Sequence, residues 1–379
     1  MIKIGTDFSG IGAPEQALIK LGIEHKSIFA CDVDKYAKQS YLANYKTDKF
    51  YDDITKRNQE NAPYVDLYVA GFPCQAFSTS GKRKGFEDTR GTLFFDLLKY
   101  LKAKRPKYFI LENVKGLLSH NGGRTFLTIL DCLAKVTNGQ YSLTNYEDGL
   151  NYYIYYKVLN TKDYGLPQNR ERVFIVGFRD EKHSFKFPKK IPLELKLKDI
   201  LQDNPNSKYN LTKKGLNILT NYQKFNKFKI LDTSNDIASC ITARCNKISN
   251  DNNFLKVGEK GSDDLIKVID TGNAQTIEFV NVKPVKLGES EKFGGSVIVG
   301  KSESSYCLRA NRNSAGVKIQ NIIRRLTPLE CFRLQGFSDS FHNKCVDAGI
   351  SNTQLYKQAG NSMTVDVLAA LINEILINE

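Results

Sequence analysis

The first 180 residues alternate short apolar runs with amphipathic segments, and this alternation constrains the fold more than any other feature. The apolar runs predict strands at Ile2–Asp7, Ser27–Cys31, Leu67–Ala70, Tyr108–Glu112, Tyr153–Leu159 and Arg172–Phe178. The amphipathic segments predict helices at Pro14–Leu21, Lys35–Asn44, Leu93–Lys104 and Thr125–Lys135. Strands that alternate with helices favour βαβ units in a mostly parallel sheet. Ligands of such sheets bind beyond the carboxyl ends of the strands, so functional residues are expected at that edge.

The pattern changes after about residue 185, where Lys, Asn and Gly become more frequent and helix signals weaken. Helical periodicity returns in the last segment, Asn352–Ile377. The sequence therefore predicts two domains. The first comprises residues 1–185 and is completed by residues 353–379, and the second, rich in short strands, comprises residues 186–352.

The chain is basic, with 55 Lys and Arg against 41 Asp and Glu among 379 residues, a net charge of +14. Residues 1–180 carry +6, residues 181–323 carry +9 and residues 324–379 carry −1. Such an excess indicates a polyanionic partner, either nucleic acid or an anionic membrane surface. No apolar run approaches the roughly 20 residues that span a bilayer, and neither a signal peptide nor a basic amphipathic helix is evident. We expect a cytoplasmic protein without a membrane partner.

The segment that follows the first predicted strand contains Gly10 and Gly12. Glycines at a strand-to-helix turn let a ligand approach the backbone closely. The third glycine of a dinucleotide fingerprint is missing because position 15 is Glu, so the loop suits a nucleoside without phosphates better than a pyrophosphate. Asp32 ends the second strand, where its carboxylate could bind ribose hydroxyls or could cap the next helix.

A cysteine, Cys74, follows Pro73 just after the apolar strand Leu67–Ala70. A loop at the carboxyl end of a strand is a suitable place for a nucleophile. The polar and basic segment 78–90 that comes next is typical of a mobile loop able to close on an anionic substrate. The eight cysteines include no CxxC pair, and we expect no metal site.

Two further strand ends carry charged side chains. Glu112 ends the strand Tyr108–Glu112, where a carboxylate in apolar surroundings could act as an acid. Arg170 and Arg172 begin the last predicted strand, and residues at i and i+2 lie on the same face of an extended chain. Together the two arginines could bind a carboxylate and a base oxygen, or they could be a charged strand edge.

The chain resembles the cytosine-5 DNA methyltransferases of the bacterial and phage restriction-modification type. Six ordered blocks carry the resemblance: DFSGIGAPEQAL, GFPCQAFSTSGKRKGFEDTRGTLFFDLL, ENVKGL, QNRERVFIVGF, RRLTPLECFRLQGF and QAGNSMTVDVL. They cover nearly all of residues 1–180 and 324–379. The resemblance implies an α/β fold, a Rossmann-like S-adenosylmethionine-dependent methyltransferase sheet with a smaller, strand-rich target-recognition domain.

The resemblance also implies catalytic roles. Cys74 would be the nucleophile that adds to carbon 6 of cytosine and so activates carbon 5 for methyl transfer. Glu112 would contact the nitrogen-3 edge and the exocyclic amine of the base. Arg172 would bind the base oxygen and position Glu112, while Arg170 would support the site.

The same resemblance implies binding residues for the cofactor, S-adenosyl-L-methionine. The matching positions are Phe8, Gly10, Gly12, Asp32, Val33, Asp53, Ile54, Gly71, Pro73, Leu93, Asn361 and Ser362. This sequence departs from the family pattern at Ala13, where glycine is frequent, and at Val33, where an aromatic residue is common.

The implied substrate is a cytosine flipped out of double-stranded DNA, because its carbon 5 is inaccessible inside the duplex. Residues 186–352 would read the DNA sequence. Residues expected to contact DNA lie in the basic segment, namely Ser78, Ser80, Lys82, Arg83 and Lys84. We expect a monomer, and a cognate restriction endonuclease acting on the same site is a candidate partner.

Three alternatives remain at this point. A branch of the same family methylates tRNA with the same catalytic blocks, although the large basic insert favours DNA. A catalytically inactive DNA-binding protein would lack Cys74, Glu112 or the arginines, and all are present. A dehydrogenase is disfavoured by the missing third glycine.

Overall fold

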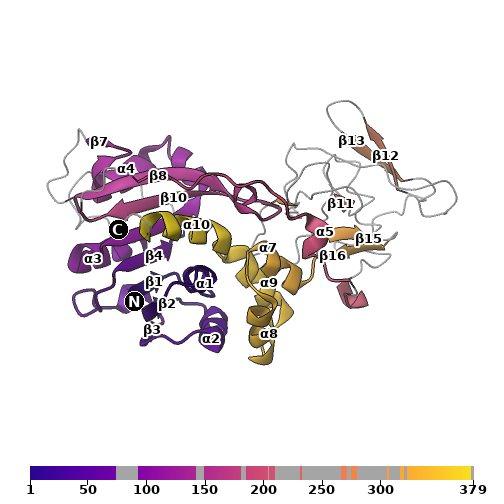
Figure 1. Cartoon of the computed structure of the whole chain (residues 1–379), viewed down its shortest axis with the longest axis horizontal. Helices are drawn as coiled ribbons and strands as arrows, with labels where there is room; N and C mark the ends of the chain where they lie inside the picture. Colours follow the sequence, from indigo (N-terminus) through magenta and orange to yellow (C-terminus); the bar gives the residue numbers. More distant parts are fainter. Residues whose placement is uncertain are drawn as a thin grey trace.

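A computed structural model describes residues 1–73, 93–141, 149–180, 185–203, 205–209 and 322–376, together with short strands between residues 231 and 319. Figure 1 shows a central sheet covered by helices. The sheet has nine strands in the order β3-β2-β1-β4-β5-β10-β8-β6-β7. Their bounds are β1 Ile2–Asp7, β2 His25–Cys31, β3 Lys49–Tyr51, β4 Leu67–Gly71, β5 Tyr108–Val114, β6 Ala134–Thr137, β7 Gln140–Tyr141, β8 Tyr152–Asn160 and β10 Glu171–Phe178. All six predicted strands are confirmed, with ends shifted by up to two residues.

The sheet is mostly parallel, as predicted, but it is mixed beyond β5. Strands β3, β2, β1, β4 and β5 are parallel to one another and β6 is parallel to β8, whereas β10 is antiparallel to both β5 and β8. The chain between β8 and β10, residues 161–170, contains only η3 (Thr161–Tyr164) and the two-residue strand β9 (Gln168–Asn169). A parallel pair needs a crossover of a dozen or more residues, so this short connection requires antiparallel pairing.

Helices cover both faces of the sheet. Their bounds are α1 Ala13–Lys20, α2 Lys35–Asn44, α3 Leu93–Lys104, α4 Arg124–Leu133, α5 Leu197–Ile200, α7 Pro328–Leu334, α8 Asp339–Asp347, α9 Asn352–Asn361 and α10 Val365–Leu376. The remaining 3₁₀ turns are η1 Ile54–Lys56, η2 Lys115–Ser119 and η4 Ser207–Tyr209. The predicted helices 35–44 and 93–104 are confirmed residue for residue.

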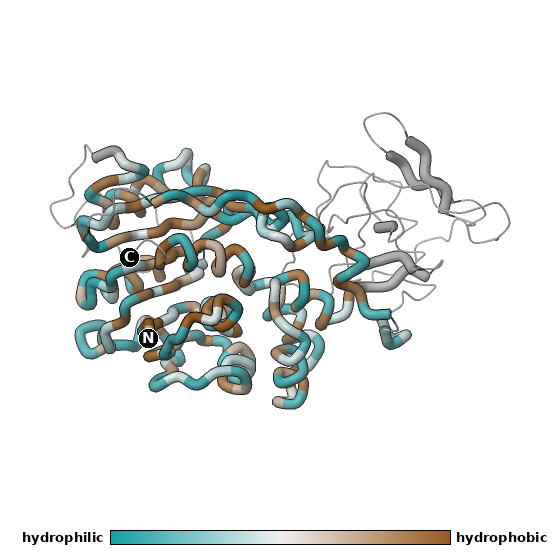
Figure 2. Tube along the Cα trace, viewed as in Figure 1, coloured by the Kyte–Doolittle hydropathy of each residue, from teal (hydrophilic) through white to brown (hydrophobic). Residues whose placement is uncertain are grey.

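Successive residues of the central strands enter two separate cores, one on each face. In β10, Phe174 and Val176 pack with α1 and α7–α10, whereas Val173 and Ile175 pack with α3 and α4. Strands buried on both faces are continuously apolar, which is why these segments show little polar alternation. Figure 2 shows the brown, hydrophobic stretches concentrated in the sheet and along α10.

The C-terminal segment, predicted to be helical over Asn352–Ile377, is two helices with a break at residues 362–364. The chain leaves α9 in an extended conformation at Ser362, and the Val365 amide donates to the carbonyl of Gln335, 2.9 Å away. Gln335 belongs to the turn after α7. The break therefore exists because a neighbouring segment binds the backbone there, a tertiary contact that local helix propensity does not encode.

Residues 326–350 pack with the first domain. Leu326, Phe332 and Phe341 are buried in the same core as Ile4 of β1 and Leu18 of α1. The predicted division of the chain at residues 185 and 352 stays a prediction. In the described part of residues 231–325 the backbone forms β11 Leu231–Asp232, β12 Ile266–Asp270, β13 Gln275–Phe279, β14 Ser305–Tyr306, β15 Gly316–Ile319 and β16 Ile322–Arg325.

Candidate active site

The loop between β1 and α1 is held in a left-handed backbone conformation at three positions. Phe8, Gly10 and Gly12 all have positive φ, at 53°, 54° and 83°. A Cβ on Gly10 would meet no protein atom within 4 Å, so the space beside it is open to a ligand. Ser9 fixes the loop to β2, because its hydroxyl donates to the carbonyl of Cys31 and accepts from the Cys31 amide.

Asp32 lies at the carboxyl end of β2 and faces this loop. Its two carboxylate oxygens accept from the backbone N–H groups of Gly10 and Asp34, both at 2.8 Å. Burial raises the Asp32 pKa, although these two N–H groups act against the increase. The sequence allowed Asp32 either to bind ribose or to cap the next helix. The cap is made by Asp34 instead, which accepts from the amides of Tyr36 and Ala37 at the start of α2. Each Asp32 oxygen keeps a lone pair for a ligand hydroxyl.

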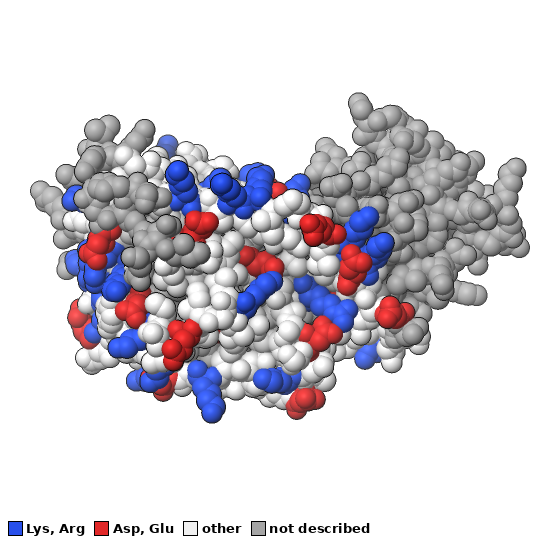
Figure 3. All heavy atoms as spheres, in the orientation of Figure 1, with Lys and Arg blue, Asp and Glu red and all other residues white. Residues whose placement is uncertain are grey.

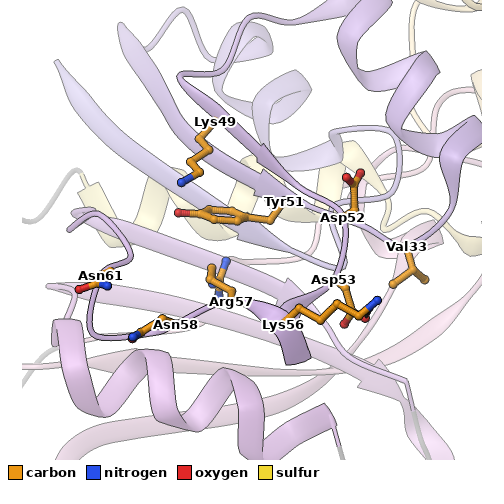
Figure 4. Close-up of a pocket in the computed structure, with 9 residues that line it drawn as sticks. All are labelled: Val33, Lys49, Tyr51, Asp52, Asp53, Lys56, Arg57, Asn58 and Asn61. Carbon is orange, nitrogen blue, oxygen red and sulfur yellow. Dashed lines mark ion pairs between the residues drawn. The ribbon is translucent and has the colours of Figure 1, made fainter.

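A pocket of about 750 Å³ opens beside Asp32, between the ends of β2 and β3 and the turn η1 (Figure 4). Val33 is 75 % exposed at one side of it. Asp53 caps η1, and hydrogen bonds from the Thr55 hydroxyl and amide lower the Asp53 pKa. Ile54 itself is buried. The pocket thus contains two of the predicted cofactor-binding residues, Val33 and Asp53.

Arg57 is a pocket residue that the sequence analysis missed. Its guanidinium donates to both carboxylate oxygens of Asp7, at 2.8 and 2.6 Å, and the Tyr68 hydroxyl donates to one of them. Lys49 and Arg57 lie on opposite sides of the Tyr51 ring (Figure 4), 4.7 and 5.0 Å from its centroid. Residues 7 and 57 are distant in sequence, and no spacing signal connects them. This buried pair fixes the end of β1 against the pocket.

Glu112 and Arg172 meet at the same edge of the sheet. The Arg172 Nε lies 3.0 Å from Glu112 Oε1, and both side chains are partly accessible, at 17 and 11 %. Strand pairing places Arg172 opposite Val114, diagonal to Glu112 on the neighbouring strand. The structure therefore brings together the carboxylate and the arginine that the sequence analysis paired.

The end of β4 lies directly beside Glu112. Gly71 pairs with Glu112 in the parallel register, and a Cβ on Gly71 would lie 3.4 Å from Glu112 Oε2 and from the Met363 Cε. The Asn113 side-chain amide donates to the Phe72 carbonyl at 2.9 Å. This bond holds the segment that leads to Pro73 against β5.

Arg170 reaches a different part of the molecule. It is buried, and its guanidinium donates to the carbonyl oxygens of Gly360 and Ser362, at 3.2 and 2.8 Å. Asn361, between them, is exposed.

Leu93 begins α3 and is half-buried against the core formed with α3 and α4. Cys74, which follows Pro73, lies outside the described residues, as do Ser78, Ser80, Lys82, Arg83 and Lys84.

Comparison with known proteins assigns the family. The model of the family described as C-5 cytosine-specific DNA methylase matches residues 3–376. The chain belongs to this family. It is thus a DNA (cytosine-5)-methyltransferase of the restriction-modification type, and S-adenosyl-L-methionine is its cofactor.

Relatives of the chain include phage and bacterial enzymes. The orphan methyltransferase M.SPRI of Bacillus phage SPR is 31% identical, and the alignment covers 99% of this chain and 97% of the relative. The Type II methyltransferase M.HaeII of Haemophilus aegyptius is 35% identical, with coverage of 97% and 91%. The fold is shared with the S. pombe Dnmt2 methyltransferase, with a TM-score of 0.64 and 17% identity over 100% of this chain and 99% of that one.

The residues on the nucleoside side fit this cofactor. The open space beside Gly10 and the acceptor Asp32 suit an unphosphorylated ribose. Glu15, buried in the first turn of α1, stands where a dinucleotide fingerprint has its third glycine, so the loop lacks the position that lets a pyrophosphate approach. In the described part of the chain no group of three His, Cys, Asp or Glu is placed to hold a metal ion, and no helix there is long and apolar enough to cross a membrane.

Proposed function

We propose that this methyltransferase modifies carbon 5 of a flipped-out cytosine within a specific duplex DNA sequence, through a covalent bond between Cys74 and the base. The observation that carries the proposal is the register at the sheet edge. Gly71 pairs with Glu112, and Asn113 binds the Phe72 carbonyl. Cys74 is two residues beyond Phe72 in the chain, so the segment that leads to the proposed nucleophile starts beside the carboxylate that would hold the base.

In this proposal Cys74, Glu112 and Arg172 have separate roles in the reaction. The Cys74 sulfur forms a bond to carbon 6, which turns carbon 5 into a nucleophile. Glu112 binds the nitrogen-3 edge and the exocyclic amine, and Arg172 orients Glu112 and binds the base oxygen. S-adenosyl-L-methionine, when bound, supplies the methyl group. Loss of the carbon-5 proton and cleavage of the bond between Cys74 and carbon 6 then release 5-methylcytosine.

The target-recognition role is proposed for the basic part of the chain that follows β10. Because residues 326–350 pack in the core of the first domain, we propose that recognition ends near residue 325 rather than 352. Figure 3 shows Lys and Arg side chains along the upper margin of the described surface, over β8 and β10. A basic margin there supports contact with a phosphate backbone. Ser78, Ser80, Lys82, Arg83 and Lys84 remain proposed DNA contacts.

We also propose that the enzyme acts as a monomer on duplex DNA. A restriction endonuclease with the same site is the proposed partner. M.SPRI is described as an orphan methyltransferase and M.HaeII as a Type II methyltransferase, so the relatives include both arrangements.

Duplex DNA that contains 5-fluorocytosine tests the proposal. With S-adenosyl-L-methionine present, carbon 5 is methylated but carries fluorine in place of the proton whose loss would release Cys74. The Cys74 adduct would therefore persist and move with the protein on a denaturing gel. We expect the adduct with the wild type and none with Cys74→Ala. Cys132→Ala is the matched control, because burial, and then the Asp131 charge, raise the Cys132 pKa to about 12 and make that thiol a poor nucleophile.

The substrate class is tested with the same wild-type protein. Methyl transfer is measured on duplex DNA and on total tRNA, and methylation-aware sequencing of DNA from expressing cells gives the recognised sequence. Methylation of tRNA but not of duplex DNA would overturn the DNA assignment, and an adduct with Cys74→Ala would overturn the nucleophile assignment.

A further inference from the structure

We infer that Arg170 is a positioning residue for the cofactor pocket, acting through Asn361, rather than a residue that touches the target base. The inference rests on the proposed function, and on the place beside the cofactor that the family resemblance implies for Asn361 and Ser362. The relevant contacts are those of the short segment between α9 and α10. Asn361 is exposed there, while its neighbours Gly360 and Ser362 are buried.

One guanidinium holds both neighbours of Asn361. Arg170 donates through Nη1 to the Gly360 carbonyl and through Nη2 to the Ser362 carbonyl. A planar guanidinium bound at two points fixes orientation as well as distance, and a lysine cannot reproduce that fork. The two peptide units that flank Asn361 are therefore oriented by Arg170.

Arg170 is itself held rigidly. Its amide donates to the Asn160 side chain at 3.1 Å, and its carbonyl accepts from the Thr161 amide at 3.0 Å. The Thr161 hydroxyl is also 2.9 Å from that of Thr364, on the far side of the break. The end of β8 thus fixes both Arg170 and the turn that it binds.

Other contacts place this turn at the cofactor side of the site. Lys357 of α9 forms a 2.6 Å ion pair with Asp34, whose own amide donates to Asp32. Met363 lies over Gly71 at the end of β4. Lys357 before Asn361 and Met363 after it therefore contact the segment that follows β2 and the end of β4, respectively. Asn361 is an exposed residue between these two contacts in the chain.

Binding of S-adenosyl-L-methionine, measured by calorimetry without DNA, tests the inference. We expect Arg170→Lys and Asn361→Ala each to raise Kd about tenfold, which corresponds to about 1.4 kcal/mol. The double variant should bind about as weakly as either single variant, because Arg170 acts through Asn361. In turnover, Arg170→Lys should raise KM for the cofactor and leave KM for DNA and the saturated kcat nearly unchanged.

Arg333→Lys is the matched control. Arg333 also binds a main-chain carbonyl, that of Ile200, but it makes an ion pair with Asp339 away from the turn. It should leave Kd unchanged. Additive effects in the double variant, or an unchanged Kd with a lowered kcat in Arg170→Lys, would overturn the inference. Failure of the wild type to bind the cofactor would instead contradict the proposed function.

A second pair of variants covers the case in which Arg170→Lys does not fold. Thr364→Val removes the hydroxyl bonds to Thr161 and Gln335 from the same turn, and Thr364→Ser keeps a hydroxyl. We expect a severalfold higher Kd for Thr364→Val only. Equal Kd values for the wild type, Thr364→Val and Thr364→Ser would show that the geometry of the turn does not govern cofactor binding.

Discussion

Two arginine–carboxylate pairs lie at the carboxyl edge of the sheet, and they differ in how far they are closed off from solvent. Arg57 and Asp7 are 1 and 0 % exposed and share two hydrogen bonds. Arg172 and Glu112 are 17 and 11 % exposed, with a contact of 3.0 Å. The first pair is fully covered by protein, whereas the second is partly accessible.

The surroundings of the two pairs explain the difference. The rings of Phe29, Tyr51 and Tyr100 pack against the Arg57 guanidinium, at 4.8 to 5.2 Å, and Tyr68 donates to Asp7. A buried pair satisfied in this way supports the fold, because removal of one partner leaves an uncompensated charge. A partly open pair has capacity left to bind a base. The same chemical pairing therefore serves structure at β1 and, in our proposal, catalysis at β5.

The largest expected effect comes from breaking the closed pair. Arg57→Met leaves the Asp7 carboxylate buried without its cation, and we expect a loss of about 3–5 kcal/mol in the free energy of unfolding. Denaturant titration followed by circular dichroism measures it. Lys26→Met, which breaks the exposed pair with Asp48, should cost no more than about 1 kcal/mol. Similar losses for both variants would contradict the contrast between closed and open pairs.

The open pair should affect turnover more than stability. Glu112→Gln keeps the shape of the side chain but removes its charge, and we expect kcat to fall roughly 10²-fold. The melting temperature should change little, because the pair is accessible to water. Glu171→Gln, at an exposed glutamate at the start of β10 bound to Lys115, is the control and should retain activity. A large fall in melting temperature with normal turnover would assign Glu112 a structural role instead.

Another buried carboxylate, that of Glu15, has hydroxyl partners, and its substitution should give the smallest effect. Tyr41 donates to it at 2.6 Å, and burial raises the Glu15 pKa despite this bond. The folded state therefore keeps the Glu15 proton at pH values where the unfolded chain has lost it, so stability falls as pH rises above about 4.5. The slope for one proton is at most about 1.4 kcal/mol per pH unit.

The pH dependence of unfolding for wild type and Glu15→Gln measures this contribution. The difference between the two should move in favour of the variant as pH rises, and Glu24→Gln, at an exposed position, should show no such trend. A constant difference across pH would mean that Glu15 binds the same number of protons in the folded and the unfolded state, which contradicts a pKa raised by burial.

The local elements could be predicted from the sequence because their periodicity is a property of neighbouring residues. Strand β1 and helices α2 and α3 have the predicted bounds. The candidate residues at strand ends were also predictable, since parallel strands gather their carboxyl ends at one edge. Asp32, Gly71 and Glu112 lie along that edge for this reason, and Gly71 and Glu112 are directly paired.

Other features depend on contacts between residues distant in sequence. The antiparallel β10, the break after α9 and the pairing of Asp7 with Arg57 are all of this kind. Arg170 and Arg172 show the limit most clearly, since two arginines predicted on one face bind different partners. One reaches the main chain between α9 and α10, and the other reaches Glu112.

The sequence by itself determined the α/β alternation, the family and the order of the motif blocks, because each is encoded in consecutive residues. The tertiary structure decided which charged groups are closed off and which stay open to a ligand. Burial is set by side chains that arrive from β2, β3 and α3 around Arg57, and from the C-terminal helices around Arg170. Solvent exclusion is a property of the packed molecule, and no local pattern specifies it.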